Sequence, residues 1–186
     1  KGSMYLVYNN NLMYHGCIPM TEDGEFAEYE IAGERVRGKA LLDRAEQIAR
    51  VGYFGTSHSD EKRYGQDFLW YLWCGSGSPV YGKSKMTSFE RYFIEDKNTW
   101  TEIKDPYYKY IENADTCDKI LREFGVDPKN FSHIVNGHVP VKIKKGEKPI
   151  RANGKLLVID GGLSRAYQEQ TGIAGYTLLF NSHGLL

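Results

Sequence analysis

The stretch "HIVNGHVPV", residues 133–141, places a histidine directly after a short apolar run and a glycine. Its β-branched residues favour a pleated, partly buried strand. Gly137 and Pro140 break that pattern, since glycine frees the backbone and proline removes a donor N–H. His138 is therefore expected at the point where a buried strand runs out into a loop.

A second histidine stands in the same setting near the start of the sequence. Residues 4–18, "MYLVYNNNLMYHGCI", contain aromatic and branched residues on both sides of an asparagine cluster. Asparagine tolerates left-handed backbone, so the pattern indicates two short strands around the turn Asn9-Asn10-Asn11. The second of these strands is expected to end at His15-Gly16.

Two such strand ends can aim imidazoles into a shared cleft, and neutral imidazole is a ligand for zinc, manganese or iron. The alternative for both His15 and His138 is a structural ring that is hydrogen-bonded to backbone. A metal site also needs more than two ligands, and no carboxylate cluster at ligand spacing accompanies these histidines. Both interpretations are open at this point.

The middle of the chain has the apolar periodicity of helices. Residues 39–54 and 60–75 predict two of them, and Gly52 and Gly55 are expected to end the first. The second helix is expected to stop at Gly75. Its predicted buried side consists of Phe68, Leu69, Leu72 and Trp73.

Two shorter helices are predicted further on. Thr87 and Glu90 have the spacing of a capping box for a short helix over residues 88–95. A later apolar stripe, closed by Gly125, indicates another helix. That stripe consists of Cys117, Ile120, Leu121 and Phe124.

Strands are predicted on both sides of this helical middle. Before it, the turn signals Asp23-Gly24 and Ala32-Gly33 within residues 21–38 indicate an edge hairpin. After it, Asn153-Gly154 is the clearest hairpin signal. The later predicted strands lie in residues 133–145, 154–162 and 175–184.

This order of elements defines the expected fold class. It is α/β in the broad sense, or α+β, with terminal strands enclosing a mainly helical insert at about residues 38–125. A chain of 186 residues with 41% hydrophobic content is most simply one domain with a substantial core.

Charge and cysteine content narrow the class of protein further. Lys plus Arg equals Asp plus Glu at 24 each, so no overall field draws the chain to nucleic acid or to an anionic membrane. The sequence has three cysteines and no C-x-x-C pair, which fits a reducing, cytoplasmic compartment. No run approaches the roughly 20 apolar residues of a membrane helix.

One motif suggests a nucleotide instead. Residues 77–84, "GSPVYGKS", fit G-x-x-x-x-G-K-[ST] at every defined position, and residues 156–160, "LLVID", look like a magnesium-carrying strand. A phosphate-binding loop follows a buried strand and opens a helix, whereas a helix is predicted before this match. Pro79 also removes a backbone donor. A surface loop between helices is therefore favoured, and a P-loop nucleotide-binding module, Gly77 to Ser84, is kept as the alternative function.

Several stretches together resemble a known family. They look like the carboxyl-terminal portion of the class III, firmicute-type fructose-1,6-bisphosphatases, over essentially the whole chain. The resemblance implies a calcineurin-like metallophosphoesterase fold, a sandwich of two mixed sheets with outer helices and a two-metal centre at the strand ends. The stretches are residues 12–26, 69–97, 133–162 and 174–184.

The same resemblance assigns the two histidines. His15 in "YHGC" resembles the isolated metal-binding histidine of the superfamily, and His138 in "NGHVP" resembles the first histidine of its Gly-His-x-His block. Both are then expected to bind the same ion of the two-metal centre, and manganese is the expected element. Pro140 stands where the second histidine of that block belongs, so the ligand set of the other metal is in doubt.

The superfamily's first three metal-site blocks have no counterpart in the sequence, so no catalytic residue is assigned. Two interpretations follow: residues 1–186 are the carboxyl-terminal part of a longer phosphatase, inactive alone and with Met4 internal, or they form a truncated homologue without the chemistry. The first is favoured, because the resemblance already includes the first residues. A non-catalytic regulatory or partner domain is a further alternative.

The implied activity is the hydrolysis of fructose 1,6-bisphosphate to fructose 6-phosphate and phosphate, a gluconeogenic reaction. Lys85, Arg91 and Arg165 are the candidates for binding the substrate, because its second phosphate needs cationic donors. Asn136 and Asp160 are expected to support the metal-bound imidazoles, although Asp160 can equally cap a turn. Homo-oligomers are expected, and neither nucleic acid nor membrane is an expected partner.

Overall fold

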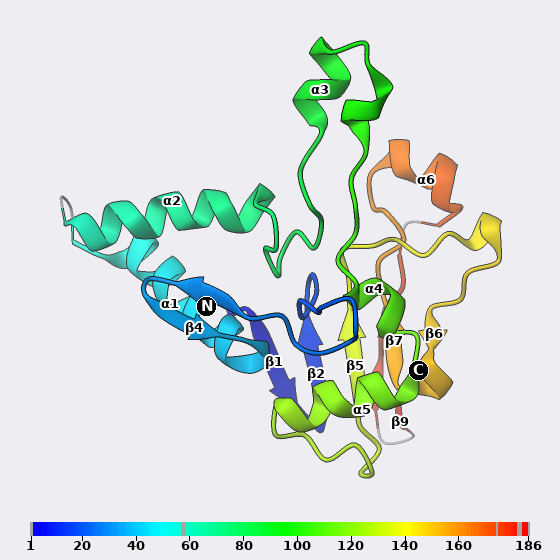
Figure 1. The fold of residues 1–186 in the computed structure, drawn as a ribbon. Helices are drawn as coiled ribbons and strands as arrows, with labels where there is room; N and C mark the ends of the chain where they lie inside the picture. Colours follow the sequence, from blue (N-terminus) through cyan, green and yellow to red (C-terminus); the bar gives the residue numbers. More distant parts are fainter. Residues whose placement is uncertain (1, 57–58, 174, 182–183, 186) are drawn as a thin grey trace. The chain divides into compact units, whose positions relative to one another are not determined.

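The computed structural model describes residues 2–56, 59–173, 175–181 and 184–185. These residues form two compact units that interleave along the chain (Figure 1). One unit comprises Lys1–Met4 and Cys17–Tyr110, and the other comprises Tyr5–Gly16 and Ile111–Leu186.

The second unit contains the main sheet, which has five strands in the order β1-β2-β5-β7-β6. The three central strands, β2, β5 and β7, run parallel, and β1 and β6 are antiparallel edges. Parallel strands bring their carboxyl ends to one edge of a sheet. The strands are β1 (Tyr5–Tyr8), β2 (Asn11–Tyr14), β5 (His133–Asn136), β6 (Ile150–Arg151) and β7 (Leu156–Val158).

The predicted hairpin at the start of the chain is present, with a shorter turn. Asn9 and Asn10 have φ values of 48° and 57°, and Tyr8 pairs directly with Asn11. Two consecutive left-handed residues match the twist of a tight hairpin, and asparagine adopts that conformation more readily than most residues. The three-residue turn is wrong, because Asn11 already belongs to β2.

The strands after the helical middle are shorter than predicted. β5 stops at Asn136, since His138 has a φ of 66° that a strand cannot contain. The hairpin at Asn153-Gly154 is confirmed: β6 and β7 pair antiparallel across the turn η3 (Ala152–Gly154). The remaining elements of this end are η2 (Ile143–Lys145), α6 (Arg165–Thr171), β8 (Phe180–Asn181) and β9 (Gly184–Leu185).

The predicted apolar stripe forms α5 (Ala114–Glu123), which contacts β5. All four stripe residues are buried, as predicted, and Gly125 ends the helix with a φ of 74°. The Asn113 side chain accepts a hydrogen bond from Asp115 N and caps the amino end. The Phe124 ring meets the Tyr5 ring edge-on, with centroids 4.8 Å apart.

In the first unit, α1 (Gly38–Phe54) and α2 (Asp60–Cys74) form the two predicted long helices and pack side by side (Figure 1). Their backbones meet at two glycines. A Cβ on Gly52 would lie 2.4 Å from the carbonyl carbon of Gly65, and a Cβ on Gly65 would lie 2.5 Å from Gly52 N. Gly52 therefore serves the crossing inside α1 and does not end the helix, which runs on to Gly55.

The buried side of α2 differs in part from the prediction. Phe68 and Leu72 are buried, whereas Leu69 is 38% exposed and Trp73 55% exposed. Phe68 and Leu72 share a face with Gly65, where α1 approaches, and residues one position further on point about 100° away from that face. Leu69 and Trp73 as core residues are therefore wrong.

The predicted edge hairpin is present as a separate ribbon. β3 (Tyr29–Ile31) and β4 (Glu34–Val36) pair with each other and form a two-stranded sheet, not the edge of a larger one. Its turn is Ala32-Gly33, with φ values of 52° and 78°. The shorter helical elements of this unit are α3 (Ser88–Phe93), η1 (Lys97–Trp100) and α4 (Tyr107–Tyr110).

The observed elements confirm the mixed α and β fold class. Helices α1 to α5 all lie between Gly38 and Glu123, and strands of the five-stranded sheet lie before and after them. The boundaries of the insert and the second sheet of a sandwich stay predictions. None of the described helices is both long and apolar enough to cross a bilayer.

Candidate metal-binding histidine pair

The two candidate histidines come from neighbouring parallel strands. β2 and β5 pair in a register that places Tyr14 opposite Asn136. His15 directly follows β2, and His138 follows β5 by two residues. Both histidines therefore lie at the carboxyl edge of the sheet, as predicted from the strand patterns.

The two imidazoles are in direct contact. His138 Nδ1 lies 3.0 Å from His15 Nε2, and the ring centroids are 4.8 Å apart at an interplanar angle of 73°. At this distance one nitrogen can donate a hydrogen to the other, and the tautomers of the two rings decide which of them donates. The His15 side chain is exposed and that of His138 is half-buried, so solvent reaches the pair.

Backbone contacts fix the loops that carry the rings. Gly137 N donates to His15 O at 3.3 Å, which extends the β2–β5 pairing beyond both strands. Val139 N donates to Gly137 O at 2.8 Å, so the chain makes a tight three-residue turn around His138. The left-handed backbone of His138 is the product of this turn, and such a conformation is uncommon for a residue with a side chain.

Asn136 and Asp160, the expected supporting residues, occupy different positions. Asn136 Nδ2 donates to three backbone carbonyls of the His15 loop. Asp160 follows β7 at the same edge, but its Oδ1 accepts from Gly162 N at 2.8 Å and caps the next turn. Of its two expected roles, this contact is that of the turn cap.

The distance between the two facing nitrogens is one that two ligands of a single metal ion can have. Two nitrogens that each lie about 2.1 Å from an ion at a right angle are about 3.0 Å apart, which matches the separation of His138 Nδ1 and His15 Nε2. Further ligands are needed. Among the described residues, no group of three or more His, Cys, Asp or Glu side chains is arranged to hold a metal.

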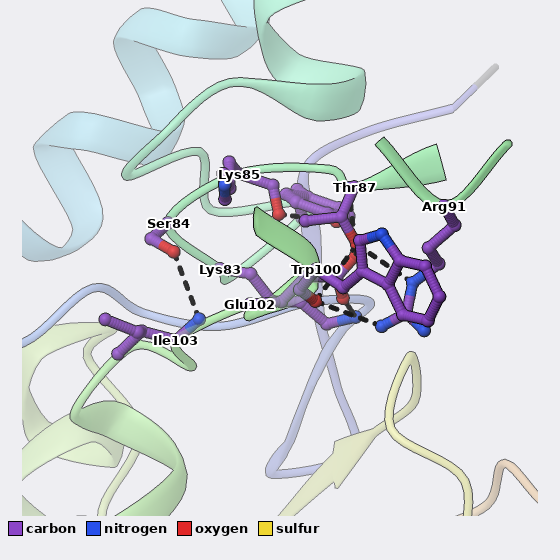
Figure 2. A network of polar contacts seen from close by, with 9 residues as sticks. Lys83, Ser84, Lys85, Thr87, Arg91, Trp100, Glu102 and Ile103 are labelled. Atoms are coloured by element: carbon purple, nitrogen blue, oxygen red, sulfur yellow. Dashed lines mark hydrogen bonds and ion pairs between the residues drawn. The ribbon is translucent and has the colours of Figure 1, made fainter. Parts of the chain in front are cut away.

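Two of the candidate substrate-binding cations belong to a polar network in the first unit (Figure 2). Lys85 Nζ donates to Thr99 O at 2.8 Å. Arg91 donates from Nε to Thr87 Oγ1 at 3.0 Å and from Nη2 to Trp100 O at 3.1 Å. Arg165, at the start of α6 in the other unit, is exposed. Their role toward substrate stays a prediction.

Glu102 is the centre of this network and was not found from the sequence. Its carboxylate pairs with Lys83 Nζ at 2.7 Å and accepts from Thr87 N at 3.1 Å and Thr87 Oγ1 at 2.9 Å (Figure 2). Burial raises its pKa, but the hydrogen bonds from Lys83 and Thr87 prevail and lower that pKa to about 2. No local pattern marks Glu102, because its partners lie 15 and 19 residues away.

This network also explains why the predicted capping box is wrong. α3 does form and Thr87 is its N-cap residue, but the Thr87 side chain makes no capping hydrogen bond. Its hydroxyl is used by Glu102 and Trp100 O instead. A tertiary carboxylate has replaced the local partner that the spacing predicts.

The residues of the phosphate-loop match adopt a different structure. They follow α2, a helix and not a strand. Ser78 Oγ accepts from Val80 N at 3.2 Å and from Tyr81 N at 3.3 Å, so two backbone donors of the loop already have a partner. Lys83 is paired with Glu102. This arrangement is that of a folded connection and lacks the open cradle of N–H groups that a phosphate requires.

Fold and histidine pair together describe a mixed α and β protein with a potential metal site at the carboxyl edge of its sheet. Comparison with known proteins gives the family. The family model described as "Firmicute fructose-1,6-bisphosphatase" matches residues 1–186, and the chain belongs to this family.

Similar curated proteins carry the same name. The chain is 60% identical over 186 residues to "Fructose-1,6-bisphosphatase class 3" of Clostridium botulinum (strain Langeland / NCTC 10281 / Type F) and, equally, to that of Clostridium novyi (strain NT). In both comparisons all of this chain is covered, but it spans only 28% of the relative's length. That share agrees with the interpretation of the chain as a portion of a longer phosphatase. No solved structure is significantly similar to it.

Proposed function

We propose that a longer protein containing this sequence hydrolyses fructose 1,6-bisphosphate to fructose 6-phosphate and phosphate. The family match and the relatives' names support the reaction. The structural observation that supports it is the contact between His15 and His138 at the carboxyl edge of the sheet. A phosphomonoester is among the slowest substrates to hydrolyse without a catalyst, so a metal-assisted route is expected.

In this proposal His15 and His138 hold one divalent ion, manganese being the expected one, in a centre of the calcineurin-like metallophosphoesterase type. When bound, metal ions at such a centre activate a water and neutralise charge on the phosphoryl oxygens. Both imidazoles must be neutral to act as ligands, and the nitrogen of each ring that faces the ion must carry no hydrogen. The other ligands and the acid for the leaving group come from outside residues 1–186.

The proposal has three further parts. Lys85, Arg91 and Arg165 are proposed to face the second phosphate. Self-association is proposed because Tyr92 and Phe93 are 83% and 80% exposed, which is unusual for large aromatic side chains. A cytoplasmic location is proposed because the described cysteines are all free thiols.

The proposal is tested in the full-length protein with His15→Ala and His138→Ala. Each substitution is expected to lower manganese-dependent phosphate release from fructose 1,6-bisphosphate at least about 100-fold, because a lost ligand costs more than a lost supporting contact. His133→Ala is the matched control, since His133 lies at the opposite end of β5. Wild-type rates in both ligand variants would refute the assignment of the pair.

A further inference from the structure

Asn136 is the last residue of β5 and is only 5% exposed. Its side-chain nitrogen points at three successive carbonyls of another segment: Tyr14 O at 3.3 Å, His15 O at 3.3 Å and Gly16 O at 2.9 Å. The amide has two hydrogens, and three acceptors surround them. A buried side chain therefore holds the whole turn that follows β2.

These carbonyls need a partner at this place. β2 ends at Tyr14, and beyond it the pairing with β5 continues through one bond, from Gly137 N to His15 O. Tyr14 and Gly16 are both buried. Buried carbonyls without a donor are unfavourable, and the Asn136 side chain donates to all three. The direction in which the chain leaves β2 is thereby set by residue 136.

The His15 backbone is held twice by the same short segment. Its carbonyl accepts from Asn136 Nδ2 and from Gly137 N, both at 3.3 Å. His138 is the next residue of that segment, and its Nδ1 faces His15 Nε2 at 3.0 Å. Residues 136, 137 and 138 thus contact His15 at the backbone and at the ring.

We propose that Asn136 is a positioning residue for the histidine pair. It acts on His15 through the backbone of residues 14–16, not by a hydrogen bond to an imidazole, and it holds the two rings together before any metal arrives. The inference rests on the proposed function in taking the pair as metal ligands. Its geometric part concerns the metal-free protein and stands apart from activity.

Asp160 lies at the same edge of the sheet but makes different contacts. Both residues follow or end parallel strands at the same edge, and Val158 is the register partner of Asn136. The Asp160 carboxylate serves a turn two residues further along its own chain, at Gly162 N. Asn136 is instead linked to residues 120 to 122 positions earlier in the sequence, which include the loop of His15.

The test uses the full-length protein with Asn136→Ala and Asn136→Ser, the second of which keeps one donor. Two properties are measured: manganese affinity by electron paramagnetic resonance of the free ion, and the carbethoxylation rate of each histidine in metal-free protein by mass spectrometry. Val135→Ala is the matched control, because it removes buried atoms from the adjacent position of β5 and valine has no side-chain donor for the three carbonyls.

Asn136→Ala is expected to weaken manganese binding about 10- to 100-fold. It should also raise the carbethoxylation rate of His15 several-fold relative to that of His133, with Asn136→Ser in between. Val135→Ala should lower the melting temperature but leave both properties at wild-type values. A folded Asn136→Ala or Asn136→Ser protein with wild-type His15 reactivity would overturn the inference, as would equal changes in Val135→Ala.

The two proposals fail in different ways. If the wild-type protein binds no manganese at His15 and His138, the proposed function is wrong. The metal-free reactivity of His15 still decides whether Asn136 positions the pair.

Discussion

At the scale of single residues, the backbone conformation of His138 indicates that this residue serves binding and not stability. A backbone φ of 66° is unfavourable for any residue with a Cβ and costs glycine nothing. A residue chosen for stability alone at this position would be glycine. The histidine is therefore best explained by its ring, which meets His15.

This argument predicts the relative stability of two variants. His138→Gly is expected to be more stable than His138→Ala by about 1 kcal/mol, because alanine retains the strained φ and glycine does not. Both variants should lose the same metal site. Urea denaturation of the two metal-free variants measures the difference, and equal unfolding free energies would mean that residue 138 is not left-handed in solution.

His133, at the other end of β5, is expected to make stability depend on pH. Its Nδ1 lies 3.0 Å from Asn11 Oδ1, and burial, followed by the charge of Lys155, lowers its pKa. A histidine with a lowered folded-state pKa binds its proton more readily when unfolded. Its contribution is therefore fully present above the unfolded pKa of about 6.5 and is lost as pH falls below that value.

The measurement is the difference in unfolding free energy between wild type and His133→Gln at pH 8 and pH 5. The wild type should lose more stability than the variant between these two values. A parallel decline in both proteins would show that other groups cause the pH dependence.

At the scale of elements, the crossing of α1 and α2 depends on two missing side chains. Replacing an exposed glycine inside a helix by alanine normally stabilises the protein by about 1 kcal/mol. At Gly65 the added Cβ would meet the backbone of Gly52 at 2.5 Å, and backbone cannot move aside as a flexible side chain can. Gly65→Ala is therefore expected to destabilise by roughly 1–3 kcal/mol.

The sign of that change is the decisive result. Gln66→Ala, on the exposed side of α2, is the control and should change stability by no more than about 0.5 kcal/mol. Thermal unfolding of both variants gives the comparison. An increase in melting temperature for Gly65→Ala would show that the two helices do not cross at these glycines.

Glu102 predicts a second pH effect, at lower pH. Residues 84 and 103 lie side by side, because Ile103 N donates to Ser84 Oγ at 3.0 Å (Figure 2) and Ser84 N donates to Ile103 O at 2.8 Å. Glu102, next to Ile103, links this pair to Thr87 through the hydrogen bond from Thr87 N. Its folded-state pKa of about 2 lies below the ordinary value of 4.5. Its contribution is thus present above pH 4.5 and is lost as pH falls toward 2.

Glu102→Gln should therefore be less stable than wild type at pH 7, and the gap should narrow at pH 3. Glu95→Gln, which changes an exposed carboxylate of the same segment, should follow the wild type at both values. Chemical denaturation at the two pH values measures this. A gap that stays constant with pH would mean that the Glu102 charge contributes nothing.

There is a physical reason why some elements were predicted correctly and others were not. Local rules succeeded where the decisive contacts are local, as in the long helices and in the turn at Asn9 and Asn10. They failed where a distant group took over, as when the Glu102 carboxylate captured the Thr87 hydroxyl. They also failed on the buried face of α2, because Leu69 and Trp73 lie next to that face and not on it.

At the scale of the whole molecule, the chain is expected to be inactive alone. His15 and His138 are proposed to supply two ligand positions, and the described residues hold no larger cluster. A two-metal hydrolysis needs more ligands than these. The purified 186-residue chain should therefore release no phosphate from fructose 1,6-bisphosphate with manganese present, and measurable turnover would show that the superfamily's other blocks are dispensable.

The positions of the two histidines could be predicted from the sequence, whereas the contacts around them could not. Apolar runs followed by a histidine placed both rings at strand ends, and parallel pairing then brought these ends together. The sequence names Asn136 as an expected supporting residue but carries no signal for its contacts, because its partners are backbone carbonyls that any residue possesses. Those contacts depend on the register of β2 and β5 and become visible only in three dimensions.

The pairing of β2 with β5 joins two strands that the ribosome makes at different times. Tyr14 and Asn136 face each other across the sheet but are 122 residues apart in the chain. At roughly 5–20 residues per second, a ribosome takes about 6–24 s to travel between them. During that time the β1–β2 hairpin presents an open strand edge, a template for pairing with other nascent chains. Chaperone capture of this hairpin during synthesis is therefore expected to raise the yield of folded protein.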